Sequence, residues 1–240
     1  MKKSVVYTGS RQFYNDMITA VKSLLCHTEV DKIYLLIVDD VFPFEMPDCT
    51  EAVNSTRLNF FHKGGPNYDN PWSSIILNRV AFTKLFPEED LILSLDVDAI
   101  VDRDISPLWD YDMGGYYVAG VPEIEKSKNG KIYINGGVVL MNLKKIREDG
   151  IDDRMIRRLN SAYCWAPDQN VINEYCQGKI LPLPSEYNSN SFVEPCKNPR
   201  IIHFAGIGEY FTWSGVRWRD EPIVLKYRNM KWETVLKQNM

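Results

Sequence analysis

Short apolar runs that end abruptly at polar residues constrain the fold of this chain more than any other feature. Two of them, at residues 32–38 and at Leu91–Leu95, are almost wholly apolar, as is typical of parallel strands covered by helices on both faces. Between such runs, apolar residues within Asp16–Leu25 recur at the period of a helix. This alternation predicts an α/β chain with a mostly parallel sheet.

The alternation extends along most of the chain, and no internal repeat interrupts it. It predicts a single Rossmann-like α/β/α sandwich, in which ligands bind beyond the carboxyl ends of the strands. The expected strands are Ser4–Thr8, 32–38, 56–62, 91–95, 116–121 and 137–142, and the expected helices are 16–25, 72–85, 143–159 and 167–177.

Composition narrows the class of protein further. The hydrophobic fraction of 45% over 240 residues is that of a globular domain, and no apolar run approaches the roughly 20 residues of a membrane span. The first residues turn polar after three apolar positions, too early for a secretory signal. The five cysteines are an odd number without a close pair, which argues against a disulfide framework or a zinc site. We therefore expect a cytoplasmic protein.

Charge is spread unevenly along the chain. The formal net charge of −4 makes nucleic acid an unexpected partner. Residues 197–240 nevertheless hold eight Lys/Arg against four Asp/Glu, together with several aromatic residues. This segment is a candidate for peripheral membrane contact or an acceptor platform. The alternative is a solvated helix surface with its aromatic residues packed under the sheet.

The main chemical feature is Asp96-Val97-Asp98, directly after the apolar run at Leu91–Leu95. On an extended segment, side chains two residues apart point the same way, so both carboxylates can face one cation. Oxygen ligands of this kind suit Mg²⁺ or Mn²⁺ shared with a diphosphate. On its own the motif is also compatible with a solvated strand end.

The surroundings of this motif carry a family resemblance. Residues Leu91–Asp110 closely resemble the corresponding stretch of family 8 glycosyltransferases, retaining enzymes of the GT-A fold that are related to glycogenin and to bacterial lipopolysaccharide galactosyl- and glucosyltransferases. Further similar segments follow in the family's order over about residues 4–210. They are Val5–Ser10, the helix that carries Arg79, Tyr133–Arg147, Pro167–Asn170 and Ile201–Gly206.

The resemblance implies a metal site and a catalytic pair. Asp96, Asp98 and His203 match the metal ligands, although His203 alone is also compatible with a buried core histidine. Asp168 and Gln169 match the acidic and amide pair next to the anomeric carbon. Pro167-Asp168 is in addition a suitable helix start, and both interpretations can hold together.

The resemblance also implies a donor site. Arg79 matches a basic residue that contacts the donor sugar or phosphates, the alternative being an exposed helix arginine. Asn135 and Gly136 match a loop that binds the donor sugar, the alternative being a tight turn. Phe13 matches a base-stacking aromatic residue, although a core position suits it nearly as well. The full donor-binding set is Thr8, Gly9, Ser10, Phe13, Arg79, Asp96, Val97, Asn135, Gly136 and Gly206.

Two positions depart from the family pattern. Ser10 stands where an aspartate usually holds the uracil or ribose region, and Glu209 replaces the lysine that binds the diphosphate. A carboxylate facing a diphosphate is repulsive. We favour a rearranged closing loop, in which another cation supplies the missing charge. The candidates are Arg217, Arg219 and Lys226.

Together these features predict a retaining transferase that moves a hexose, glucose or galactose first, from a UDP-sugar to an unknown glycan, lipid-linked or protein acceptor, with Mn²⁺ or Mg²⁺. Because Gln169 is an amide and a poor nucleophile, we favour front-side substitution through an oxocarbenium-like ion pair. The alternative is a non-catalytic nucleotide-sugar binding protein, and a nucleotidyltransferase ranks last. We expect a catalytic domain at 1–210, a packed extension at 211–240, and a monomer or homodimer.

Overall fold

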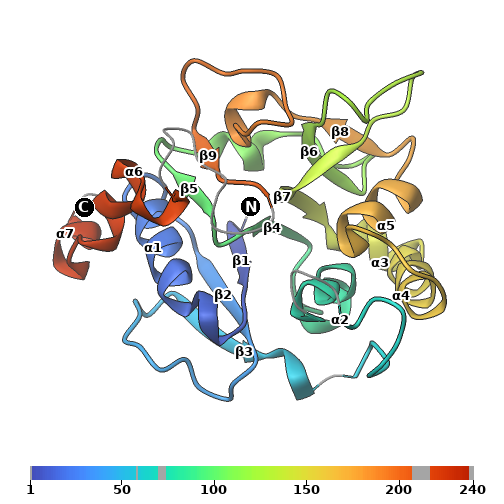
Figure 1. The fold of residues 1–240 in the computed structure, drawn as a ribbon, viewed down its shortest axis with the longest axis horizontal. Coiled ribbons are helices and arrows are strands. Elements are labelled where there is room, and N and C mark those ends of the chain that lie inside the picture. Colours follow the sequence, from blue (N-terminus) through green and yellow to red (C-terminus); the bar gives the residue numbers. More distant parts are fainter. Residues whose placement is uncertain (1, 58, 70–73, 207–216, 238–240) are drawn as a thin grey trace.

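The computed structural model describes residues 2–57, 59–69, 74–206 and 217–237, which form a sheet between two layers of helices (Figure 1). Seven strands make up the sheet, in the order β3-β2-β1-β4-β7-β6-β8. They are β1 (Ser4–Thr8), β2 (Lys32–Ile37), β3 (Thr50–Asn54), β4 (Leu91–Leu95), β6 (Val118–Pro122), β7 (Ile134–Asn142) and β8 (Ile180–Pro182).

The sheet is mostly parallel, as the sequence predicts. Strands β1, β2, β3 and β4 run in one direction, and β6 pairs with β8 in parallel. Only β7 runs against its neighbours, pairing antiparallel with both β4 and β6. The carboxyl end of β4 therefore lies beside the beginning of β7, at the centre of the sheet.

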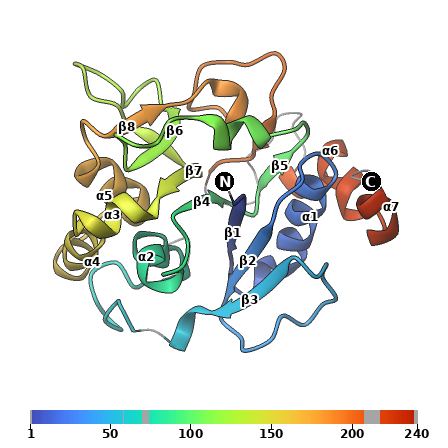
Figure 2. The same ribbon diagram turned by 180° about the vertical axis from the view of Figure 1, so that it is seen from behind.

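Helices cover both faces of the sheet, and Figure 2 shows the same layers from behind. One face packs against α1 (Tyr14–Leu25), and α6 (Pro222–Arg228) and α7 (Trp232–Lys237) pack against α1 in turn. The other packs against a 3₁₀ helix (Ser74–Ala81), α2 (Phe82–Leu85), α3 (Leu143–Glu148), α4 (Ile151–Ser161) and α5 (Pro167–Tyr175). Together the layers make the predicted α/β/α sandwich.

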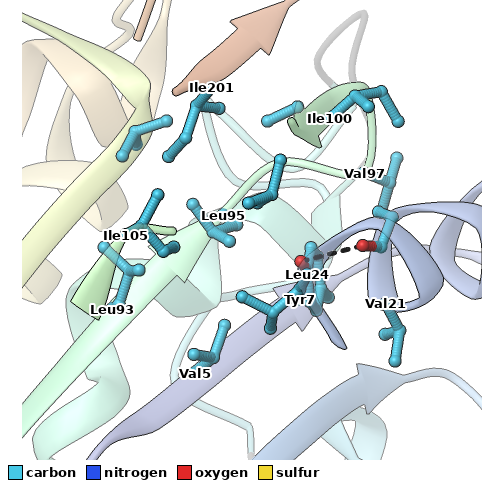
Figure 3. Packing of buried hydrophobic residues seen from close by; sticks show 14 of the residues in the cluster. Val5, Tyr7, Val21, Leu24, Leu93, Leu95, Val97, Ile100, Ile105 and Ile201 are labelled. Carbon is cyan, nitrogen blue, oxygen red and sulfur yellow. Dashed lines mark hydrogen bonds between the residues drawn. The ribbon is translucent and has the colours of Figure 1, made fainter. Parts of the chain in front are cut away.

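Alternation along the strands divides the core into two clusters. In β1, Val5 and Tyr7 point to the cluster on the α1 side, whereas Val6 points to the cluster on the α2 side. Figure 3 shows the first cluster, where the Tyr7 hydroxyl donates a hydrogen bond to the Ala20 carbonyl of α1 at 3.3 Å. A central strand buried on both faces has no polar side, which explains the unbroken apolar runs.

Three predicted elements differ from the structure. The third strand is Thr50–Asn54 rather than 56–62; it is an edge strand, half-exposed, and so lacks an apolar run. The helix predicted at 72–85 is described from Ser74 onward, as a 3₁₀ helix followed by α2. The single helix predicted at 143–159 is two helices, because Gly150 adopts a positive φ of 62° between them.

A small second sheet brings a distant segment to the end of β4. Strands β5 (Ala99–Val101) and β9 (Ile201–His203) pair antiparallel, with Ala99 opposite His203. The pairing continues where the Phe204 N–H donates to the Asp98 carbonyl at 3.1 Å. In the part of the chain that the structure describes, no helix combines the length and apolar character of a membrane span.

A candidate metal and nucleotide-sugar site

The two aspartates of the central motif lie in a turn that follows β4. The Ala99 N–H donates to the Asp96 carbonyl at 3.1 Å, and the Asp96 N–H donates to the Gly137 carbonyl on β7 at 2.8 Å. The sequence argument assumed an extended segment here, and that assumption is wrong, because the backbone forms a turn. The turn, rather than strand alternation, brings the carboxylates of Asp96 and Asp98 together.

These carboxylates meet a buried imidazole. One ligand atom each from Asp96, Asp98 and His203 lie within 4.8 Å of one another. The His203 Nε2 atom lies 3.3 Å from Asp98 Oδ1 and 3.9 Å from Asp96 Oδ2. Burial lowers the pKa of His203, but the two carboxylates outweigh it and leave that pKa above its ordinary value. Two carboxylates and an imidazole form a mixed oxygen and nitrogen donor set for a divalent cation.

A hydrogen bond at Nδ1, the ring nitrogen that does not face the aspartates, fixes the orientation of His203. Its Nδ1 atom lies 2.8 Å from Asn188 Oδ1, an acceptor, so Nδ1 carries a proton and Nε2 is the ring nitrogen that faces the aspartates. The ring lies against Gly137, where an added Cβ atom would stand 1.9 Å from His203 Cε1. Only glycine at position 137 leaves room for this imidazole.

Arg79 joins the turn that carries Asp96 and Asp98 to the predicted catalytic pair of Asp168 and Gln169. It is only 4% exposed, so the alternative of an exposed helix arginine is wrong. One terminal nitrogen donates to the Gly136 carbonyl and to Asp168 Oδ2, both at 2.7 Å, and the other contacts Asp96 Oδ1. A single guanidinium thus bridges two carboxylates from different elements.

Asp168 and Gln169 lie in the first turn of α5, which begins at Pro167. Burial raises the pKa of the Asp168 carboxyl, and the guanidinium of Arg79 opposes that rise. Gln169 Oε1 accepts from the Gly136 N–H at 2.7 Å. Pro167 therefore starts a helix whose next two residues line the pocket, which is compatible with both interpretations of this segment.

Asn135 belongs to a polar network rather than to a tight turn. It lies near the start of β7, and its Oδ1 accepts from the Gly137 N–H and from Asn188 Nδ2, both at 3.0 Å. Its Nδ2 donates to Glu123 Oε1 at 2.9 Å, and Gln169 Nε2 donates to the same oxygen at 3.0 Å.

These groups open onto one pocket of about 360 Å³. Its lining includes four carboxylates, from Asp96, Asp98, Glu123 and Asp168, against the two basic side chains of Arg79 and Lys126. The formal excess of two negative charges fits a divalent cation. The other lining residues are Ile76, Asn135, Gly136, Gly137, Trp165, Ala166, Gln169, Phe192, His203, Ala205 and Gly206.

Two aromatic side chains stand exposed in the lining of this pocket. Trp165, just before α5, is 58% exposed, and Phe192 is 41% exposed. A buried loop holds Phe192 in place, because Asn190 Oδ1 accepts from the Phe192 N–H at 2.8 Å and Asn190 Nδ2 donates to Asn188 Oδ1 at 3.1 Å. The same Asn188 orients His203, so Phe192 and the candidate metal triad of Asp96, Asp98 and His203 share one support.

The predicted nucleoside residues lie at the carboxyl end of β1 and are not part of this pocket lining. Gly9 is closely packed, since an added Cβ atom would lie 3.0 Å from Met17 Cε and 3.3 Å from Phe13 Cβ. The Thr8 hydroxyl is buried and has no hydrogen-bond partner among the described residues. Phe13 is half-buried against the core beside α1, and Val97 is buried in the same core.

The closing segment lies partly outside the described residues. Glu209, at the position of the family's lysine, is among residues 207–216 and has no structural account, and the proposed division at 210 lies there too. Of the rival cations, Arg219 binds Asp16 with Nε at 3.0 Å and a terminal nitrogen at 2.7 Å. Lys226 lies 3.5 Å from Asp102. Neither lines the pocket.

The aromatic residues of the C-terminal segment that the structure describes pack inward. Trp218 and Tyr227 are buried, and the Tyr227 hydroxyl donates to Asp102 Oδ1 at 2.8 Å. Lys22 of α1 donates to the Met230 carbonyl at 2.6 Å and lies over the Trp232 ring. This packing agrees with the alternative in which the aromatic residues support the sheet.

Sequence comparison decides the family. The profile of glycosyl transferase family 8 matches residues 4–214. The chain belongs to glycosyl transferase family 8. The match includes every predicted site residue, from Thr8 to Gly206.

Two relatives illustrate its place in family 8. The glycosyltransferase GlyF of Streptococcus pneumoniae is 25% identical over 98% of this chain, which spans 63% of that relative. The lipopolysaccharide 1,2-glucosyltransferase of Escherichia coli is 32% identical over 49% of this chain and 39% of its own length. The chain spans between about a third and two thirds of the length of the pneumococcal and Streptococcus gordonii relatives that it matches.

Solved structures confirm the GT-A fold. The glycosyltransferase GlyE of S. pneumoniae matches 99% of this chain, which covers 63% of that structure, with a TM-score of 0.74 at 23% identity. The galactosyltransferase LgtC, solved with donor and acceptor sugar analogues, matches 98% of this chain and 99% of its own length, with a TM-score of 0.69 at 17% identity.

Sequence reasoning missed four charged or aromatic residues that line the pocket and one, Asn188, that supports it from behind His203. Glu123, Lys126, Trp165, Asn188 and Phe192 lie in connecting segments or next to the ends of elements, without a periodic or spaced pattern. A weak signal exists for Trp165, because it stands two residues before the Pro167-Asp168-Gln169-Asn170 segment that carries the family resemblance. Glu123 and Asn188 become recognisable only when distant segments come together.

Proposed function

We propose that this family 8 domain transfers a hexose from a UDP-sugar to an acceptor hydroxyl, with retention of anomeric configuration and with a divalent cation. The observation that carries the proposal is the convergence of Asp96, Asp98 and His203 on the pocket that also presents Arg79 and Gln169. A metal triad, a buried guanidinium and amide groups in one cavity suit a diphosphate joined to a sugar.

The donor set fits Mn²⁺, with Mg²⁺ as the second choice. Asp96 and Asp98 would supply oxygen ligands, and His203 would supply Nε2, since Asn188 occupies its Nδ1. When bound, such a cation neutralises the charge that develops on the leaving diphosphate. The excess negative charge of the pocket without a cation supports this assignment.

The catalytic pair suits substitution without a protein nucleophile. Asp168 is buried and its Oδ2 is held by Arg79, so it is not free to attack. The bond from the anomeric carbon to the diphosphate breaks while the bond to the acceptor oxygen forms on the same face. The acceptor proton passes to an oxygen of the leaving diphosphate, and the products are UDP and a glycoside. Gln169 and Asn135 would orient the sugar.

The exposed aromatic pair suits the acceptor. Trp165 and Phe192 present flat apolar surfaces on the pocket that carries Gln169. Aromatic side chains bury large areas while polar neighbours bind hydroxyl groups, a combination that suits a sugar ring. We therefore propose a glycan acceptor, with glucose or galactose as the transferred sugar. The relatives named as a glucosyltransferase and a galactosyltransferase support this choice.

The test is UDP release from a panel of UDP-sugars, with Mn²⁺ and with EDTA, for the wild type and the Asp98→Ala variant. Asp110→Ala, which removes an exposed aspartate from the same chain segment, is the matched control. We expect slow hydrolysis of one sugar in which water replaces the acceptor. The activity requires Mn²⁺ and is lost in Asp98→Ala on the order of 10³-fold, whereas Asp110→Ala keeps it.

Two results would contradict the proposal in different ways. Binding of UDP and Mn²⁺ without turnover of any sugar would favour the non-catalytic binding protein. Hydrolysis that persists in EDTA and in Asp98→Ala would show that the reaction does not depend on a divalent cation.

A further inference from the structure

Glu123 is a buried carboxylate at the sugar end of the pocket with no role assigned so far. It follows β6, where a register shift between Gly120 and Pro122 bends the strand against β7. Its N–H donates to the Tyr133 carbonyl at 2.8 Å, and the residue is 4% exposed. A carboxylate this deeply buried needs partners for both oxygens.

Both oxygens of Glu123 have such partners. Oε1 accepts from Asn135 Nδ2 at 2.9 Å and from Gln169 Nε2 at 3.0 Å. Oε2 lies 2.9 Å from the ammonium group of Lys126. With its oxygens occupied in this way, Glu123 is poorly suited to attack a sugar, but it holds two amides that face the pocket.

The contacts of Glu123 determine which way these amides point. An ionised carboxylate only accepts hydrogen bonds, so the nitrogen of each amide must face Glu123. On the other side, the N–H groups of Gly136 and Gly137 only donate, so the oxygen of each amide must face them. The Gln169 and Asn135 oxygens are therefore fixed on the β7 side of the pocket.

The hydrogen bonds keep the same donor-to-acceptor direction as far as His203 of the metal triad. Asn135 Oδ1 accepts from Asn188 Nδ2 at 3.0 Å, which turns Asn188 Oδ1 toward His203 Nδ1. The chain from Glu123 through Asn135 and Asn188 to His203 is continuous and has one direction. It links the group that orients the sugar to the imidazole that would bind the metal.

A neighbouring pair provides an internal comparison. Glu125 and Lys128 form an ion pair at 2.8 Å with the same three-residue spacing as Glu123 and Lys126. The side chain of Glu125 is 86% exposed, however, and its ion pair is with the exposed Lys128. The two pairs share spacing and charge but differ in whether they contact the amides.

We propose that Glu123 is a positioning residue that fixes the amide groups of Gln169 and Asn135 at the donor sugar. The inference rests on the proposed function, because these amides matter only if a sugar binds between them and the metal. Glu123 touches neither the diphosphate nor the metal in this assignment. Its loss should affect sugar transfer more than UDP binding.

The experiment compares Glu123→Gln with the matched variant Glu125→Gln. It measures the Kd for UDP with Mn²⁺ by calorimetry and kcat and KM for UDP-sugar hydrolysis. We expect Glu123→Gln to lower kcat by on the order of 10- to 100-fold, as supporting residues of a site do, while the Kd for UDP changes less than about threefold. Glu125→Gln should match the wild type in both.

Each other outcome bears on the inference. Unchanged kcat in Glu123→Gln would overturn it, and so would an equal loss of kcat and UDP affinity, which indicates a structural role. Absence of UDP-sugar hydrolysis in the wild type would refute the proposed function and this inference with it. If the wild type hydrolyses the UDP-sugar and Glu123→Gln does so at the same kcat, only the inference is refuted.

A second variant covers the case in which Glu123→Gln does not fold. Glu123→Asp keeps the charge but withdraws the carboxylate by one methylene group. We expect it to fold, to bind UDP as the wild type does, and to hydrolyse the UDP-sugar at an intermediate rate. Full wild-type turnover in Glu123→Asp would contradict a role that depends on the position of the carboxylate.

Discussion

The two ends of the proposed donor site are built in different ways. At the metal and sugar end, charged and amide groups from the 3₁₀ helix, β7, α5, β9 and the segments that follow β4, β6 and β8 bind one another. At the nucleoside end, Thr8, Ser10 and Phe13 come from one short segment at the end of β1, and the Ser10 side chain makes no cap for the helix that follows.

This difference suggests that one end orients the sugar for reaction, whereas the other provides affinity for the nucleoside. Chemistry at the anomeric carbon requires fixed dipoles, which a connected polar network supplies at low cost during the reaction. Recognition of a base requires mainly a surface on which to stack, and a few residues can supply it. We therefore expect substitutions at the first end to affect the fold and turnover, and those at the second to affect binding alone.

The largest effect should come from Arg79→Met. Removing the guanidinium leaves Asp168 buried without its partner, and breaking such a pair costs about 3–5 kcal/mol. Denaturant unfolding would measure this loss, with Arg11→Met as the control because the Arg11 side chain pairs with Asp39 while 75% exposed. If Arg79→Met and Arg11→Met lose the same free energy of unfolding, the buried pair of Arg79 and Asp168 does not stabilise the sugar end more than an exposed ion pair would.

A smaller effect should follow from Gly137→Ala. The new methyl group would overlap the His203 ring, and relief of such overpacking typically costs about 1–3 kcal/mol. The displaced imidazole should also weaken Mn²⁺ binding by about 10-fold or more, measured by calorimetry. Gly115→Ala is the control, since an added Cβ there has open space. Unaltered Mn²⁺ affinity in Gly137→Ala would argue against His203 as a ligand.

The smallest effect should come from Phe13→Ala at the nucleoside end. Loss of a stacking surface should weaken UDP binding by about 1 kcal/mol, roughly fivefold, with little change in kcat. Fluorescence titration with UDP would measure it, and Phe44→Ala removes an exposed phenylalanine elsewhere as a control. A fall in kcat with unchanged UDP affinity would contradict the proposal that the end with Phe13 contributes to binding and not to turnover.

Much of the fold was predictable because buried strands carry a local signal. Leu91–Leu95 is buried on both faces and apolar apart from Ser94, and its bounds agree with β4. Thr50–Asn54 gave no such signal, because an edge strand has one neighbour and mixed exposure. The break between α3 and α4 depends on the backbone of Gly150, whose left-handed conformation a single glycine in sequence does not reveal.

Prediction of the site met a similar limit. Asp96 and Asp98 form a motif with a fixed spacing, and the segment around His203 resembles the family, so the sequence predicts that these three residues belong together. Glu123 could not be distinguished from Glu125, because both have a lysine three residues later. What separates them is burial against Gln169 and Asn135, which depends on the folding of residues far along the chain.

The pairing of β5 with β9 also sets an order of events during synthesis. Asp98 leaves the ribosome more than a hundred residues before His203, a delay of about 5–20 s at ordinary rates of elongation. Strands β1 to β4 are synthesised before that interval begins, whereas His203 is added only at its end. A nascent chain would therefore present the two aspartates of the proposed metal site without their imidazole until residues 201–203 pair with β5.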